Sequence, residues 1–274
     1  MKIRGFILIG FLLASTLRAQ ATRPVQSPLL NRIGIDQKLG AQVPGNLVFT
    51  DETGKTVHFS DYLGKKPVIL SLVYYNCPML CTMSLNDLTH AMGAMPLNPG
   101  DDFEIVTVSF DPREGPDLAM AKKKQYVHEY KKPKAAQAWH FLCGDETNIR
   151  KLTDTVGFRY AWDDKYGQYA HAAGFVVLTP KGTVSRYFYG VDYSSKDMRL
   201  ALTEASQGTI GHPVDAFLLY CFHYDPSTGR YSLAILRLLK VAGAITVLGL
   251  GAFLFVNFRR DARASRLTSD PSDE

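Results

Sequence analysis

The stretch PVILSLVYYNCPMLC, residues 67–81, decides the fold of this chain. Its first half, from Pro67 to Tyr74, is a continuous run of apolar, β-branched and aromatic residues with the length of a buried strand. Its second half contains Cys77 and Cys81. Three apolar residues then recur at helical spacing: Leu85, Leu88 and Met92. We therefore expect a buried strand that leads directly into a helix, with both cysteines at the start of that helix.

Strand and helix signals alternate along the rest of the domain. Before this stretch, two short apolar runs flank an Asp/Gly turn at residues 51–54, which predicts a hairpin. The elements expected after it are, in order, a strand at 103–110, a helix at 117–130, a strand at 138–143, a helix capped by Asp145 and ended by Gly157, strands at 174–179 and 184–189, and a helix capped by Ser194. This order predicts an α/β fold, a thioredoxin-like domain whose central mixed sheet is flanked by helices on both faces.

Cys77 and Cys81 are four residues apart, so on a helix their sulfurs lie on one face, close enough to share a metal ion or to form a disulfide. Pro78 fits the first helical position. That places Cys77 at the N-cap, where free backbone N–H groups and the helix dipole favour the thiolate. The alternative is a structural disulfide, but a link across so few residues restrains the unfolded chain little. We therefore expect a reactive pair.

A histidine is the candidate third ligand. Two thiolates select a soft ion such as Cu(I), and an added imidazole suits both Cu(I) and Cu(II). His171 follows the loop-like residues 166–170 and precedes the strand at 174–179, so it could face the start of the helix that carries the cysteines. A histidine in a surface loop, without a metal, is the alternative.

Other side chains near the cysteines have competing interpretations. Met79 and Met83 offer thioethers, but methionine at a helix start is more often a packing residue. Asp111 either tunes the metal site or caps the helix that begins near Pro116, and we favour the cap.

Two further cysteines are less easily assigned. Cys143 ends a predicted strand, and Cys221 lies beyond the domain. A disulfide between them, a second metal site that uses Cys221 and His223, and two unpaired thiols all remain open.

Three motifs, in order, resemble the Sco/SenC family over about residues 40–206. They are Val73-Tyr74-Tyr75-Asn76-Cys77-Pro78-Met79-Leu80-Cys81, then Val108-Ser109-Phe110-Asp111-Pro112, then His171 before a strand that ends in Thr179-Pro180. The resemblance implies a thioredoxin-like fold, copper bound by Cys77, Cys81 and His171, and a part in metallating the binuclear copper site of cytochrome c oxidase subunit II or another cuproprotein client.

The chain also departs from the pattern of that family. Met79-Leu80 stands where an acidic residue is usual within the cysteine motif, and Ala172 replaces the usual serine after the histidine. Glu114 replaces the commoner aspartate after Asp111-Pro112. Family members more often carry an N-terminal membrane anchor.

The two ends of the chain predict a membrane tether. Lys2 and Arg4 precede an apolar run and small residues, which is typical of a secretory signal peptide over residues 1–20; an uncleaved anchor helix is the alternative. Residues 238–258 are long and apolar enough for a transmembrane helix. The signal peptide then places the bulk of the chain on the outer, periplasmic side of the cytoplasmic membrane, with an arginine-containing tail at 259–274 in the cytoplasm.

The expected organisation follows from these assignments. It comprises the signal peptide, a linker at 21–40, the thioredoxin-like copper-binding domain at 41–206, a connecting segment at 207–237, the transmembrane helix and the tail. The net charge is +5, and no run of interleaved basic and aromatic residues is present. We therefore expect no binding to nucleic acid.

Two functions compete for the cysteine pair. One is a metallochaperone that holds copper and passes it to a client by ligand exchange. The other is a thiol-disulfide oxidoreductase in which Cys77 attacks, Cys81 resolves, and a thioredoxin-like protein supplies electrons. Three residues separate the cysteines, whereas a typical thioredoxin motif has two, and this spacing and His171 favour copper. A sensor that signals through residues 259–274 is a weaker third interpretation, because the tail has no interaction motif.

Overall fold

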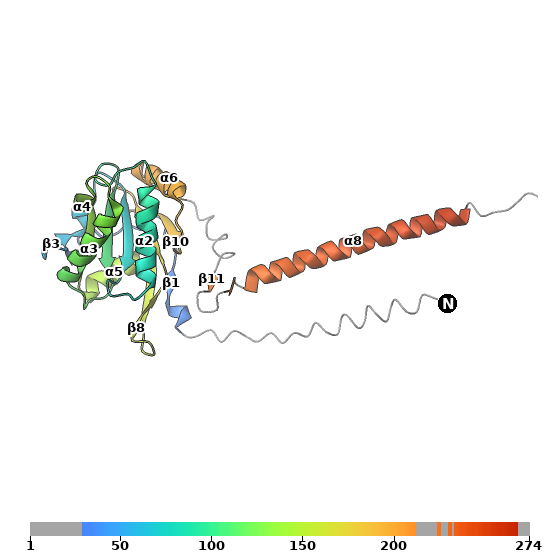
Figure 1. The fold of residues 1–274 in the computed structure, drawn as a ribbon, viewed down its shortest axis with the longest axis horizontal. Helices are drawn as coiled ribbons and strands as arrows, with labels where there is room; N and C mark the ends of the chain where they lie inside the picture. Colours follow the sequence, from blue (N-terminus) through green and yellow to red (C-terminus); the bar gives the residue numbers. More distant parts are fainter. Residues whose placement is uncertain (1–28, 212–223, 226–229, 232, 268–274) are drawn as a thin grey trace, which may run out of the picture. The chain divides into compact units, whose positions relative to one another are not determined.

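The computed structural model describes residues 29–211, 224–225, 230–231 and 233–267 (Figure 1). The chain divides into two compact units, residues 1–211 and 212–274, which are described separately. The expected signal peptide lies outside the described residues, and so do Cys221 and His223.

A five-stranded mixed sheet forms the centre of the first unit, with the strand order β10-β9-β4-β5-β6. The strands are β4 (Val68–Val73), β5 (Glu104–Ser109), β6 (Trp139–Leu142), β9 (Gly174–Leu178) and β10 (Val184–Tyr189). β4, β5 and β6 run parallel, and β9 pairs antiparallel with both β4 and β10. Every residue of β4 and β9 is buried, as their continuous apolar runs predict.

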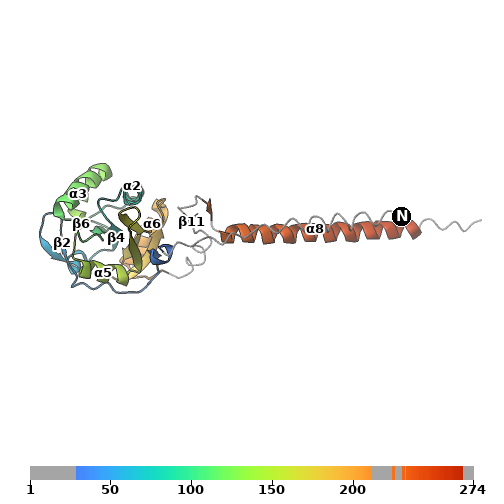
Figure 2. The same cartoon turned by 90° about the horizontal axis from the view of Figure 1, so that it is seen from below.

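Helices cover this sheet. They are α2 (Leu80–Gly93), α3 (Pro116–Tyr130), α4 (Ala135–Ala138), α5 (Glu146–Thr155) and α6 (Ser195–Ser206). Figure 2 shows α2 and α3 on one side of β4 and β6, and α5 on the other. The predicted caps are confirmed, since Asp145 accepts the Asn148 N–H and Ser194 accepts the Asp197 N–H. The mixed α/β, thioredoxin-like fold is therefore as expected.

Short strands complete the unit at its edges. β2 (Val48–Thr50) and β3 (Thr56–His58) form the predicted hairpin, which is followed by the 3-10 turn η2 (Phe59–Tyr62). A separate sheet has the order β1-β7-β8, from β1 (Gly34–Ile35), β7 (Phe158–Asp163) and β8 (Gln168–His171). The expected linker at 21–40 thus includes β1, which pairs with β7, and the 3-10 turn η1 (Leu30–Arg32).

The interpretation of residues 166–170 as a loop is wrong for its second half. Residues 168–171 form β8, which pairs antiparallel with β7 so that Tyr160 lies opposite His171. The strand is hard to recognise in the sequence because all four of its residues are only half-buried, so it has no apolar alternation. His171 consequently belongs to a strand.

The second unit contains the short strands β11 (Tyr224–Asp225) and β12 (Arg230–Tyr231) and the long helix α8 (Leu233–Leu267). The transmembrane helix expected at 238–258 falls within α8. Within the part of the chain that the structure describes, no helix has the combined length and apolar character needed to cross a membrane.

Candidate metal centre

Cys77 lies in the loop between β4 and α2, before the helix begins. The prediction of Cys77 at the N-cap and Pro78 at the first helical position is wrong, because α2 starts at Leu80 and Met79 is its N-cap. The loop is instead stabilised by its own backbone hydrogen bond, in which the Cys77 N–H donates to the Tyr74 carbonyl at 3.2 Å. The Cys81 N–H donates to the Cys77 sulfur at 3.3 Å, so that sulfur still accepts a hydrogen bond from the first turn of the helix.

Cys81 lies on the first turn of α2 and points back toward the loop. Its side chain is 3% exposed, and its sulfur accepts the Tyr74 N–H at 3.5 Å. Cys77 is 9% exposed. The two sulfurs are therefore shielded, and the less shielded one belongs to the loop.

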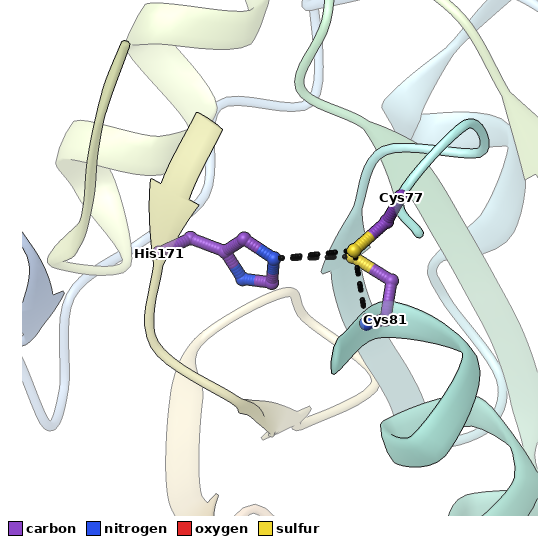
Figure 3. A group of neighbouring side chains, drawn as sticks. All are labelled: Cys77, Cys81 and His171. Atoms are coloured by element: carbon purple, nitrogen blue, oxygen red, sulfur yellow. Dashed lines mark hydrogen bonds between the residues drawn. The ribbon is translucent and has the colours of Figure 1, made fainter. Parts of the chain in front are cut away.

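His171 reaches the sulfurs from the end of β8, as Figure 3 shows. Its Nε2 lies 3.3 Å from Cys81 Sγ and 3.9 Å from Cys77 Sγ. Its Nδ1 lies 2.9 Å from the Ala172 carbonyl oxygen, which can only accept, so Nδ1 carries the proton. This fixes the tautomer in which the Nε2 lone pair faces the cysteines, as a metal-ligating histidine requires.

Aromatic rings hold the imidazole in this orientation. The His171 ring lies edge-on to Tyr74 and Phe110, at centroid distances of 5.7 and 5.3 Å, and 6.3 Å from Phe158. Tyr74 therefore forms a wall of the site. Tyr75 does not, because its hydroxyl points into the domain and donates to the Leu142 carbonyl at 2.8 Å.

The three side chains fit a single metal ion. Their ligating atoms lie within 4.8 Å of one another. Among the described residues, no other group of three or more His, Cys, Asp or Glu side chains has this geometry. An ion roughly 2.0–2.3 Å from sulfur and nitrogen ligands holds those ligands about 3.3–4 Å apart. The two sulfur–nitrogen distances fall in this range, so the imidazole needs little movement to bind an ion with the sulfurs.

The pKa values of the two thiols are shifted in opposite directions. A hydrogen bond from the Cys81 side chain and the N–H groups of Cys81 and Met79 lower the pKa of Cys77 to about 3, against the opposing effect of burial. Burial and the neighbouring Cys77 thiolate raise the pKa of Cys81 above its ordinary value. Cys77 is thus the thiolate of the pair, and Cys81 keeps its proton until a metal or disulfide replaces it.

An acid 33 residues beyond Cys81 supports the cysteine loop. The Glu114 carboxylate accepts the N–H groups of Tyr75 and Asn76, at 2.6 and 2.7 Å, and the Ser109 hydroxyl at 2.5 Å. The sequence singled out Glu114 only as a departure from the usual aspartate. Its position after the β5 strand, whose end lies beside the end of β4, is the signal that could have indicated this contact.

The prediction that Asp111 caps the following helix is wrong. Gly115 is the N-cap of α3, and no side chain caps it. The Asp111 carboxylate instead accepts two hydrogen bonds from the Arg113 guanidinium, at 2.8 and 2.7 Å. That guanidinium covers the rings of Trp162 and Tyr169 on the β7–β8 hairpin, at 4.7 and 5.5 Å. These three residues near the site were missed in the sequence.

The remaining sulfur-containing candidates differ in their burial. Met79 and Met83 are 65% and 45% exposed, so the expected packing role is wrong for both. Cys143 is buried and has no disulfide partner among the described residues. Cys221 lies outside those residues, so the disulfide with Cys143 stays a prediction.

The fold and the site define a class, a thioredoxin-like domain with a Cys-Cys-His metal centre at the start of a helix. A family model described as SCO1/SenC matches residues 35–206. The chain belongs to the SCO1/SenC family.

The chain is also similar to individual proteins and solved structures. The SCO2-like protein RP587 of Rickettsia prowazekii is 26% identical over 183 residues, which cover 63% of this chain and 81% of the relative. The crystal structure of a putative electron transfer protein from Aquifex aeolicus VF5 is 27% identical, with a TM-score of 0.55 over 64% of this chain and 98% of that one. Arabidopsis thaliana ScoI, with copper bound, is 18% identical, with a TM-score of 0.48 over 61% of this chain and 99% of that one.

Proposed function

We propose that this protein binds one copper ion through Cys77, Cys81 and His171 and delivers it to a cuproprotein client. The observation that carries the proposal is the convergence of two sulfurs and one imidazole Nε2 in a domain matched by the SCO1/SenC model. Soft thiolates select Cu(I) over harder ions, and the imidazole makes the same site suitable for Cu(II).

The acidities of the ligands suit both capture and release. Cys77 is already a thiolate at neutral pH and offers a ligand without losing a proton. Cys81 must give up its proton when the ion binds, so copper binding releases a proton from this site. A client thiolate can then displace one protein ligand at a time, which allows transfer without free copper ions in solution.

The proposed client is the binuclear copper site of cytochrome c oxidase subunit II, and family membership supports that choice. We also propose that residues 1–20 are a signal peptide and that residues 238–258 tether the domain to the outer, periplasmic side of the cytoplasmic membrane. The sequence supports both assignments. Lys2 and Arg4 precede an apolar run and small residues, and only Thr246 and Asn257 are polar among residues 241–258.

A thiol-disulfide oxidoreductase is the second candidate, and the low pKa of Cys77 favours it. In this reaction the Cys77 thiolate attacks a client disulfide and releases one client thiolate. Cys81 then loses its proton and attacks Cys77 in the mixed disulfide, which releases the second client thiolate. The client gains two electrons, Cys77 and Cys81 become a disulfide, and a thioredoxin-like dithiol must reduce them again.

His171→Ala separates the two functions, with His128→Ala as the matched control because His128 is exposed on α3. The metallochaperone proposal expects His171→Ala to lose Cu(II) binding and to fail to restore oxidase activity in cells that lack the protein, while it still reduces a model disulfide. His128→Ala should resemble the unmodified protein in all three assays. Normal oxidase assembly by His171→Ala would overturn the proposal.

A further inference from the structure

The strand that carries His171 contacts the core through side chains and not through backbone pairing with the central sheet. β8 is the edge strand of the small β1-β7-β8 sheet and is not paired with the central sheet, whereas α2, which carries Cys81, packs in the main body of the domain. The distance from Nε2 to the sulfurs therefore depends on how the β7–β8 hairpin is held against the core.

Arg113 connects the hairpin to the core through a fixed ion pair. The Asp111 side chain, 7% exposed, lies just after β5 and accepts hydrogen bonds from Nε and Nη2 of Arg113 at 2.8 and 2.7 Å. The same carboxylate also accepts the Arg113 backbone N–H at 3.0 Å. A planar guanidinium held at two points cannot rotate freely, so its face has a defined direction.

The face of the guanidinium packs against the β7–β8 hairpin. The Arg113 guanidinium carbon is 4.7 Å from the centre of the Trp162 ring and 5.5 Å from that of Tyr169. Trp162 and Tyr169 are opposite each other across β7 and β8, and their rings are 5.0 Å apart. Tyr169 is two residues before His171, so their side chains leave the same face of β8.

We propose that Arg113 is a positioning residue for His171, an inference that rests on the proposed copper site. The guanidinium, fixed by Asp111, packs against the cross-strand pair Trp162 and Tyr169. This contact holds the next cross-strand pair, Tyr160 and His171, near the cysteines. Loss of Arg113 should let the hairpin move away and separate the imidazole from the two sulfurs. Partners of this kind, beyond the ligands themselves, typically change metal affinity by about 10–100-fold when they are removed.

Charge alone predicts the opposite result. Removing a cation near a Cu(II) site relieves repulsion and strengthens binding, whereas loosening His171 weakens it. Arg113→Lys keeps the charge, but an ammonium group is not planar. It cannot both donate two parallel hydrogen bonds to Asp111 and stack on the Trp162 ring, so this variant should behave like Arg113→Ala. Lys165→Ala is the charge control: its ammonium lies 5.0 Å from the Tyr166 ring on the same hairpin and has no part in the Asp111 contact.

The test uses the full chain and two readouts. With copper, we expect Arg113→Ala and Arg113→Lys to bind Cu(II) roughly tenfold more weakly and to lose nitrogen hyperfine coupling in the electron paramagnetic resonance spectrum. Trp162→Leu should do the same, Trp162→Phe should retain most of the affinity, and Lys165→Ala should match the unmodified chain. The Arg113→Ala, Trp162→Leu double variant should be no weaker than either single variant, because both remove the same contact.

The second readout needs no copper, so it separates failure of this inference from failure of the proposed function. In the metal-free chain, Arg113→Ala should exchange the amide hydrogens of residues 168–171 about tenfold faster and leave those of β9 unchanged. Unchanged exchange in β8, or Cu(II) binding as tight as in the unmodified chain with its nitrogen coupling intact, would overturn the assignment of Arg113. Failure of the unmodified chain to bind copper would instead count against the proposed function, while the exchange result still decides the role of Arg113.

Discussion

The Glu114 carboxylate accepts the backbone N–H of Asn76 at 2.7 Å and so fixes the residue immediately before Cys77. The contact joins positions 38 residues apart and is nearly excluded from water, since Glu114 is 8% exposed. The cysteine loop is thus shaped by a buried acid in the segment between β5 and α3 rather than by the helix that follows the loop.

Replacement of Glu114 by glutamine should therefore destabilise the domain. A glutamine keeps one acceptor oxygen, but its NH₂ group faces an N–H or hydroxyl donor, so at least one buried hydrogen bond is lost. We expect the free energy of unfolding in urea to fall by about 2 kcal/mol. Glu146→Gln, at a residue 67% exposed, is the control and should change it by less than about 0.5 kcal/mol. Equal effects of the two substitutions would contradict the role of Glu114.

The acidity of Cys77 predicts a thiolate that persists in acid. Because its pKa is lowered to about 3, the reduced, metal-free protein should keep one thiolate from pH 8 down to about pH 4, whereas an ordinary thiol is protonated below about pH 8.5. Absorbance at 240 nm measures this in a Cys221→Ser background. Cys143 contributes nothing in this range, since burial raises its pKa to about 12. Cys77→Ser should abolish the signal, and a signal that disappears below pH 7 would refute the assignment.

Two buried tyrosines allow a matched comparison of a hydroxyl that donates a hydrogen bond with one that does not. Tyr75 donates to the Leu142 carbonyl at 2.8 Å, whereas the buried Tyr130 hydroxyl has no hydrogen-bond partner within the described part of the chain. Tyr75→Phe should lower the free energy of unfolding by about 1–2 kcal/mol because it leaves a buried carbonyl without its donor. Tyr130→Phe should be neutral or stabilising. The reverse order in urea titrations would show that the hydroxyl contacts are misassigned.

His140 should make the domain less stable in mild acid. Burial, aided by Lys123, lowers its pKa from 6.5 to about 4, so between these values the unfolded chain binds a proton that the folded chain does not. The free energy of unfolding should therefore fall as the pH drops from about 6.5 to 4, by roughly 1–2 kcal/mol at pH 5.

His140→Phe tests this, since it keeps a flat ring beside Tyr62, whose centroid lies 4.5 Å from that of His140. The variant should lose less stability than the unmodified protein between pH 7 and pH 5. Parallel pH profiles for the two proteins would eliminate His140 as the titrating group.

The central sheet could be predicted because burial leaves a clear signature in the sequence. β4 and β9 are buried along their full length, so their residues form apolar runs that only Ser71 interrupts. The helix caps at Asp145 and Ser194 are local, because the side chain and the N–H it accepts are three residues apart. Local chemistry and complete burial are the features that a single sequence exposes.

The errors arise where distant residues decide the local structure. Cys77 was expected at a helix cap, but Glu114 takes the N–H groups before it and the helix begins later, at Leu80. β8 has four half-buried residues, and its pairing with β7 across a turn has no apolar pattern. The three candidate ligands could be predicted from motifs, but the contacts that position them could not.

X-ray absorption at the copper edge of the chain, loaded anaerobically with Cu(I), is the sharpest test of the proposed copper site. We expect one copper per chain with two sulfur ligands and one imidazole nitrogen, and loss of the nitrogen in His171→Ala while both sulfurs remain. A sulfur-only site that is unchanged by His171→Ala, or copper retained after both Cys77 and Cys81 are replaced by serine, would contradict it.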